Sequence, residues 1–106
     1  MSQYFMFFVV TKLTFERQTT PHEGRELAAL VEKLRARFKI SVEIADEFHK
    51  GGEAGVVVAA VHTSEMKLSS LIDSISDACE DSGFGRIHSE NTILEDFEAF
   101  QDEHED

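Results

Sequence analysis

The sequence has little cysteine, few bases and no long apolar run, and each shortage excludes a class of protein. Its single cysteine, Cys79, excludes an intramolecular disulfide framework, and its place in an apolar helical stripe indicates a buried thiol rather than a nucleophile. The apolar run from Tyr4 to Val10 is too short to span a membrane, and nothing around it resembles a signal peptide. We therefore expect a cytoplasmic protein with no membrane contact.

Basic residues are outnumbered by acidic residues, which are concentrated at the end of the chain. The 21 acids and 10 bases give a net charge of −11. Residues 95–106 hold seven acids and no lysine or arginine, so residues 1–94 hold 14 acids against 10 bases. We therefore divide the chain into one domain over 1–94 and an acidic tail over 95–106. A field of this sign repels nucleic acid and anionic lipid at long range.

The motifs of common enzyme and metal-site classes are also missing. No nucleophile elbow, cysteine–histidine spacing or dinucleotide fingerprint occurs, and Gly51-Gly52 fits no phosphate loop. The histidines are well separated, and the best local cluster, Asp46, Glu47 and His49, is typical of a solvated strand end. We therefore predict a protein that is not an enzyme, with no catalytic residue, metal site, cofactor or small-molecule substrate.

The clearest signal that the sequence does contain lies between Leu27 and Asp46, where a helical pattern changes directly into a strand pattern. Apolar residues first recur at helical spacing and then alternate with polar or small ones. The helical set is Leu27, Leu30, Val31, Leu34 and Phe38, and the strand set is Ile40, Val42 and Ile44. Upstream, Thr20, Pro21 and Glu23 form a typical helix start.

The remaining patterns complete the order strand, helix, strand, strand, helix, strand. The strands are expected over 4–15, 39–48, 55–61 and 86–94, and the second helix ends at Ser82-Gly83. The first and third strands are apolar on both sides, which is typical of central strands, and the last alternates poorly, as an edge strand can. Right-handed crossovers place both helices together. We therefore predict an α+β, ferredoxin-like βαββαβ fold, with two helices on one face of a four-stranded antiparallel sheet.

The other face of this sheet has no predicted cover. It would expose Tyr4, Met6, Phe8 and Val10 of the first strand, together with part of the third. An apolar patch of that size usually marks an interface. We therefore predict a small interaction domain that forms a homodimer through this face, with a precise role that the sequence does not specify.

An alternative function arises from the bases of the first helix. Arg25, Lys33, Arg35, Arg37 and Lys39 could contact an anionic partner such as RNA or the ribosome. A solvated helix surface explains the same residues, and the third strand lacks the aromatic residues of an RNA-recognition sheet. The acidic tail could mask this surface, bind a basic partner, or remain solvated.

The helix-to-strand junction resembles the YlxP-like family of small bacterial proteins of unknown function. Residues 37–42, Arg-Phe-Lys-Ile-Ser-Val, match that family's Arg-Phe-Asn-(Val/Ile)-Ser-Val, and residues 55–59 match its Gly-Val-Ala-Val-Val-like strand at the same separation. The similarity spans roughly residues 5–85, although only Arg25 keeps a base in the family's basic helix start. The resemblance implies a ferredoxin-like fold and a link to translation and ribosome assembly.

Overall fold

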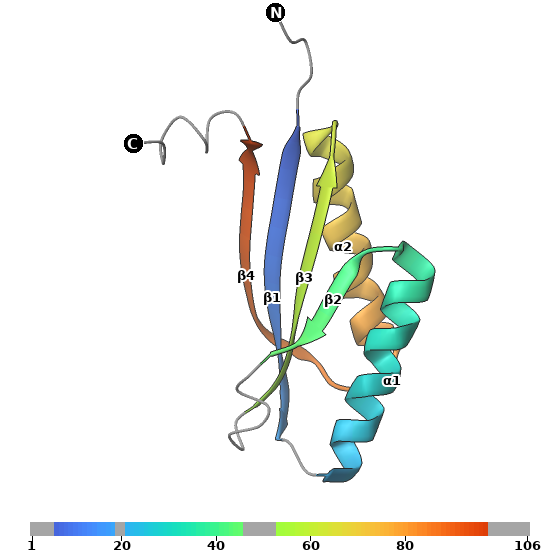
Figure 1. Ribbon diagram of the computed structural model, residues 1–106. Helices are drawn as coiled ribbons and strands as arrows, with labels where there is room; N and C mark the ends of the chain where they lie inside the picture. The colour runs from blue at the N-terminus through green and yellow to red at the C-terminus, as the bar shows by residue number, and fades with distance from the viewer. Residues whose placement is uncertain (1–5, 19–20, 46–52, 98–106) are drawn as a thin grey trace, which may run out of the picture.

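The computed structural model describes residues 6–18, 21–45 and 53–97 (Figure 1). Its elements follow the predicted order βαββαβ. They are β1 (Phe7–Gln18), α1 (Pro21–Phe38), β2 (Ser41–Ile44), β3 (Glu53–His62), α2 (Glu65–Asp81) and β4 (Ile87–Asp96). Neither described helix is both long and apolar enough to cross a membrane. The predicted cap Thr20 lies outside the described residues.

The four strands form one antiparallel sheet in the order β2-β3-β1-β4. Both helices pack against the same side of this sheet. In Figure 1, α2 lies behind β2 and β3, and α1 lies to the right of β2. The predicted ferredoxin-like fold is therefore confirmed, with β1 and β3 at the centre and β4 at an edge. The strand pattern identified the central pair by its two apolar faces, although the helices cover only one of these faces in the structure.

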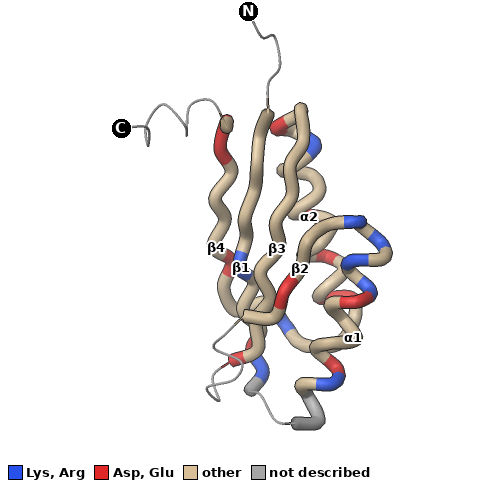
Figure 2. Tube along the Cα trace, in the orientation of Figure 1, with Lys and Arg blue, Asp and Glu red and all other residues tan. Residues whose placement is uncertain are grey.

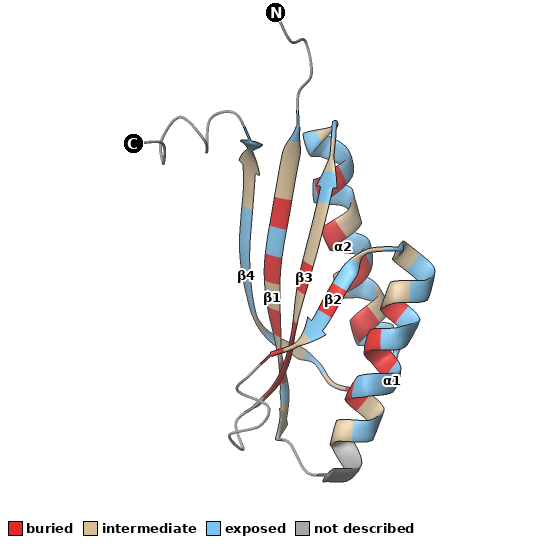
Figure 3. Cartoon of the chain, viewed as in Figure 1, coloured by how far each residue is buried: buried red, intermediate tan, exposed pale blue. Residues whose placement is uncertain are grey.

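The core fills the layer between the sheet and the helices (Figure 3). Alternate residues of the central strands meet the apolar stripe of each helix, as the periodicity predicted. The sheet contributes Val9, Leu13, Phe15, Val56 and Val58; α1 contributes Leu27, Leu30, Val31 and Leu34; α2 contributes Leu68, Ile72, Ile75 and Cys79. Phe38, Ile40 and Ile44 of the predicted stripe are only partly buried against this cluster.

The change from helix to strand takes place at Lys39. This residue has a φ of 55°, and its N–H donates to the Arg35 carbonyl at 2.9 Å, which closes the last turn of α1. Glycine is the usual residue in this left-handed conformation because a Cβ is strained there. The Arg35 guanidinium then secures the turn, since its Nε and Nη2 donate to the Val42 carbonyl at 3.1 and 2.6 Å.

The strand ends differ from the predicted ones. β1 runs to Gln18 rather than residue 15, and β2 covers only Ser41–Ile44 within the predicted 39–48, of which 46–48 lie outside the described residues. β4 continues to Asp96 because Phe7 and Phe8 pair with Asp96 and Glu95. The predicted tail, 95–106, therefore begins inside a strand, and residues 98–106 lie outside the described part.

Candidate functional site

The face of the sheet turned away from the helices carries a continuous apolar patch. The strand register sets its members, because Phe8 pairs with Val61, and Val10 pairs with both Ala59 and Ile93. We call this set the open-face patch: Met6 just before β1, Phe8 and Val10 of β1, Val57, Ala59 and Val61 of β3, and Ile93 of β4. Four of its side chains are strongly exposed, with exposed fractions of 68% for Val61, 55% for Ile93, 38% for Met6 and 36% for Val10.

Polar side chains surround the patch on the same face. Lys12 pairs with Asn91 beyond one end of it, and Glu95 pairs with Phe8 near the other. The Oε2 atom of Glu95 is buried and has no hydrogen-bond partner among the described residues. A buried carboxylate oxygen without a donor is costly, and Ser76 Oγ on α2 is likewise buried without a partner among the described residues.

Three of the four residues predicted for an interface meet in this patch. Met6, Phe8 and Val10 lie together on it, while Tyr4 lies outside the described residues. Sequence reasoning did not single out Ile93, although its alternation with Leu94 was the available signal: Leu94 packs against the core and Ile93 points the other way.

The five predicted basic contacts do not form one continuous surface. Figure 2 shows acidic residues interspersed with basic ones along α1. Arg25 and Lys33 are exposed, whereas Arg35 is bound by the Val42 carbonyl and forms ion pairs with Glu32 and Glu43 at 2.6 and 3.0 Å.

Arg37 and Lys39 lie apart from that ion-pair network. The Arg37 guanidinium stacks over the Phe38 ring at 4.9 Å, and Lys39 is at the end of the helix. None of the described contacts supports an RNA or ribosome partner, which stays a prediction.

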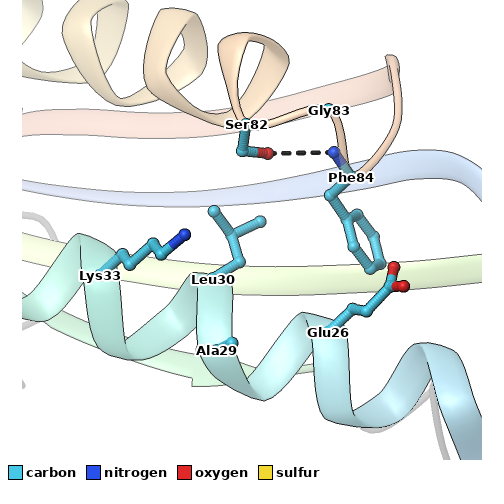
Figure 4. Close-up of a pocket in the computed structure, with 7 residues that line it drawn as sticks. All are labelled: Glu26, Ala29, Leu30, Lys33, Ser82, Gly83 and Phe84. Atoms are coloured by element: carbon cyan, nitrogen blue, oxygen red, sulfur yellow. Dashed lines mark hydrogen bonds between the residues drawn. The ribbon is translucent and has the colours of Figure 1, made fainter.

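A groove separates α1 from α2 on the helical side, and Figure 4 shows one end of it. This end has a volume of about 350 Å³ and is lined by Glu26, Lys33 and Phe84 among others. Contacts of Arg17 hold the residues around it in place. The Arg17 guanidinium donates to the Phe84 carbonyl at 2.6 Å and stacks over the Phe84 ring at 4.6 Å. Arg17 also pairs with Glu26 at 2.6 Å. We assign these residues to joining β1, α1 and the end of α2.

The ionisable groups of the core and sheet edges do not form a reactive centre. Burial, and secondarily the charge of Glu80, raises the pKa of the Cys79 thiol from 9.0 to about 11, so the thiol is protonated at neutral pH. His88 Nδ1 lies 2.9 Å from a Glu53 carboxylate oxygen on the surface. Within the described ranges, no three histidine, cysteine or acidic residues are placed to hold a metal ion.

No family model matches the chain, and no curated protein was found to be similar to it. Among solved structures, it is similar to a dimeric ferredoxin-like protein of unknown function from Thermobifida fusca. The TM-score is 0.56 and the identity 13%, over 92% of this chain and 95% of that one. This likeness shows the fold.

A second solved structure is a proposed antibiotic biosynthesis monooxygenase from Chloroflexus aurantiacus. Its TM-score is 0.46 and its identity 14%, over 85% of this chain and 92% of that one. This finding contradicts the prediction that the chain is not an enzyme. That prediction rested on missing linear motifs, whereas a fold brings catalytic groups together from separate strands and helices. At this level of similarity, no activity is transferred to this chain.

Proposed function

We propose that the chain is an interaction domain that works as a homodimer, in which the open faces of two sheets pack against each other. The observation that carries the proposal is the open-face patch, whose large apolar side chains are exposed on both central strands and on β4. Apolar surface gathered in this way usually marks an interface. The Thermobifida fusca protein, which shares this fold, is described as dimeric, and this supports a dimer.

A two-fold axis suits the position of the patch. Ala59, Val10 and Ile93 form one apolar row across three neighbouring strands. An axis through this row brings the patch of each protomer onto the same patch of the other, as a two-fold interface requires.

Charge substitution at the patch tests the proposal. We expect the native chain to sediment as a dimer at micromolar concentration and Ile93→Glu to sediment as a monomer. A buried carboxylate at the interface should raise the dissociation constant by roughly 100-fold or more, because an unpaired charge there must be desolvated.

Met66→Glu is the matched control. Met66 is 79% exposed on α2, on the helical side of the sheet, so the same change should leave the dimer intact. Circular dichroism should show both variants folded. A native chain that is monomeric at micromolar concentration, or an Ile93→Glu variant that dimerises like the native chain, would overturn the proposal.

A further inference from the structure

One cleft lies where β3 extends beyond its neighbour β2. The register of the two strands begins at Ser41 and Ala59, so β2 does not run beside the last residues of β3, from Ala60 to His62. The end of α1 closes one side of this gap and the first turns of α2 close the other. The resulting cleft has a volume of about 480 Å³. This size is typical of small-molecule sites. We call it the β3-end cleft.

The charge of this cleft differs from that of the rest of the protein. Lys39, His62 and Lys67 line it, and no aspartate or glutamate of the described residues does. The other described hollows that contain a base also contain an acid: Glu26 beside Lys33, Asp81 beside Arg37, and Glu32 and Glu43 beside Arg35. In a chain with a net charge of −11, a concave surface with bases alone is a local reversal of sign. A cleft of one sign focuses the field and attracts the opposite charge.

The polar groups of the cleft are available to a ligand. Neither lysine ammonium forms an ion pair or hydrogen bond with another described residue. The N–H of Ser64 donates to His62 Nδ1 at 2.9 Å, so the neutral ring carries its proton on Nε2. His62 therefore presents an N–H donor, which suits an anionic oxygen.

The backbone at Lys39 adds a second observation. Its φ of 55° is a strained conformation for a residue with a side chain, and glycine would relieve the strain. A lysine at this position therefore costs stability and contributes nothing to the core, since it is exposed. Strain of this kind is a reason to look for a function in the side chain.

The remaining walls of the cleft are apolar. Phe38, Ile40 and Leu71 line it and are only partly buried against the core, whereas Leu68, which also lines it, is 1% exposed and belongs to the core. An inorganic ion would leave these walls in contact with water. From the bases and the apolar walls together, we propose that the β3-end cleft binds a small organic anion, with a carboxylate or phosphate held by Lys39, Lys67 and His62 and an apolar body against these walls. This site is additional to the proposed dimer interface.

Calorimetric titration of the full chain with four probes tests this inference. Phenylacetate and phenyl phosphate carry both features, benzyl alcohol lacks the charge, and inorganic phosphate lacks the apolar body. We expect the first two to bind at least about tenfold more tightly than the last two, because a charge-assisted hydrogen bond in a partly desolvated site is worth about one decade in affinity. The tighter of the first two identifies the anionic group.

Two variants and a control locate the binding. Lys67→Gln should weaken binding by about tenfold. Lys39→Gly should weaken it by a similar factor and at the same time raise the thermal midpoint, because glycine tolerates the backbone conformation. Lys33→Gln, in the α1–α2 groove beside Glu26, should leave binding unchanged.

The location can also be read from amide chemical shifts, which should change on probe addition at residues 60–71 and not around Ile93. Failure of both organic anions to bind, equal binding of benzyl alcohol, or equal weakening by Lys33→Gln would overturn the inference.

Discussion

The two faces of the sheet are made from the same strands, yet they differ in what covers them. On β1, Val9 and Leu13 point to the helices and are fully buried, while Val10 points the other way and is 36% exposed. Met6, just before β1, is 38% exposed. Apolar composition therefore does not decide burial in this protein. The presence of the helical layer decides it, and the open face remains a surface that the single chain cannot cover.

The polar groups of the two faces differ in the same way. Thr11 is the buried polar residue of the covered face, and its hydroxyl donates to the Asn91 carbonyl at 3.2 Å and lies 2.7 Å from the Thr92 hydroxyl. Glu95, on the open face, has a buried oxygen without a partner in the described part of the chain. The buried hydroxyl of the covered strand face therefore has its partners, although Ser76 Oγ of α2 is, like Glu95 Oε2, buried without a partner among the described residues.

The largest expected difference between the faces is in thiol reactivity. At pH 8, a thiol whose pKa is about 11 is ionised to the order of 0.1%. Cys79 should therefore react with Ellman's reagent only as the protein unfolds. A cysteine introduced as Ile93→Cys should react at least about 100-fold faster in dilute solution and become protected at concentrations where the dimer forms. Rapid reaction of Cys79 in the folded chain would contradict the difference.

The pH dependence of stability follows from the same thiol. Because the folded pKa lies above the ordinary value of 9.0, the folded state holds the proton more tightly than the unfolded state. The stability that the protonated Cys79 thiol contributes to the folded state is therefore fully present below pH 9. It is lost as pH rises to about 11. Urea unfolding of the native chain and of Cys79→Ala across this range should show a steeper decline for the native chain.

The second comparison is between truncations on the two faces of β1. Leu13→Ala should lower the free energy of unfolding by about 3 kcal/mol, because it opens a cavity under the helices. Val10→Ala, on the open face, should cost less than about 1 kcal/mol. Both are best measured by urea denaturation in the Ile93→Glu background, so that unfolding is not coupled to dissociation. Equal costs would show that the open face is as well packed as the core.

At the junction between α1 and β2, we expect a loss of stability smaller than that of Leu13→Ala. Arg35→Ala removes both hydrogen bonds to the Val42 carbonyl and two partly exposed ion pairs, and should cost about 1–2 kcal/mol. Arg37→Ala removes a stacked but exposed guanidinium and should cost less than about 0.5 kcal/mol. Thermal unfolding of the two variants separates a structural arginine from a surface one.

The smallest expected difference is between two threonines of β1. Thr11→Val should destabilise the chain by about 1 kcal/mol. It removes a buried hydroxyl, so the Asn91 carbonyl and the Thr92 hydroxyl of β4 lose a hydrogen-bond partner. Thr14→Val lies on the open face, where valine is at least as favourable in a strand, and should change stability by less than about 0.5 kcal/mol. An equal loss of stability in Thr14→Val would indicate that a threonine hydroxyl matters as much on the open face as on the covered face.

The parts of the site that the sequence predicted depend on spacing along one strand or one helix. Met6, Phe8 and Val10 share a face because strand side chains alternate, so the sequence could place them together. Ile93 and Val61 join them only through the register of β1 with β4 and β3. Arg35 was predicted as a contact for an anion, but the turn at Lys39 brings Val42 back to its guanidinium, which a linear sequence does not reveal.

By itself, the sequence determined the order of the elements, the stripe of α1 and the change of period at its end, because these depend on local steric preferences and on apolar spacing. The sequence also placed Met6, Phe8 and Val10 on the uncovered face, but only the tertiary structure brought Val61 and Ile93 beside them, since that depends on strand register. It also decided that Lys39 of the α1–β2 connection, His62 of β3 and Lys67 of α2 line one cleft. Proximity of this kind is a product of register and packing between elements, and no local pattern contains it.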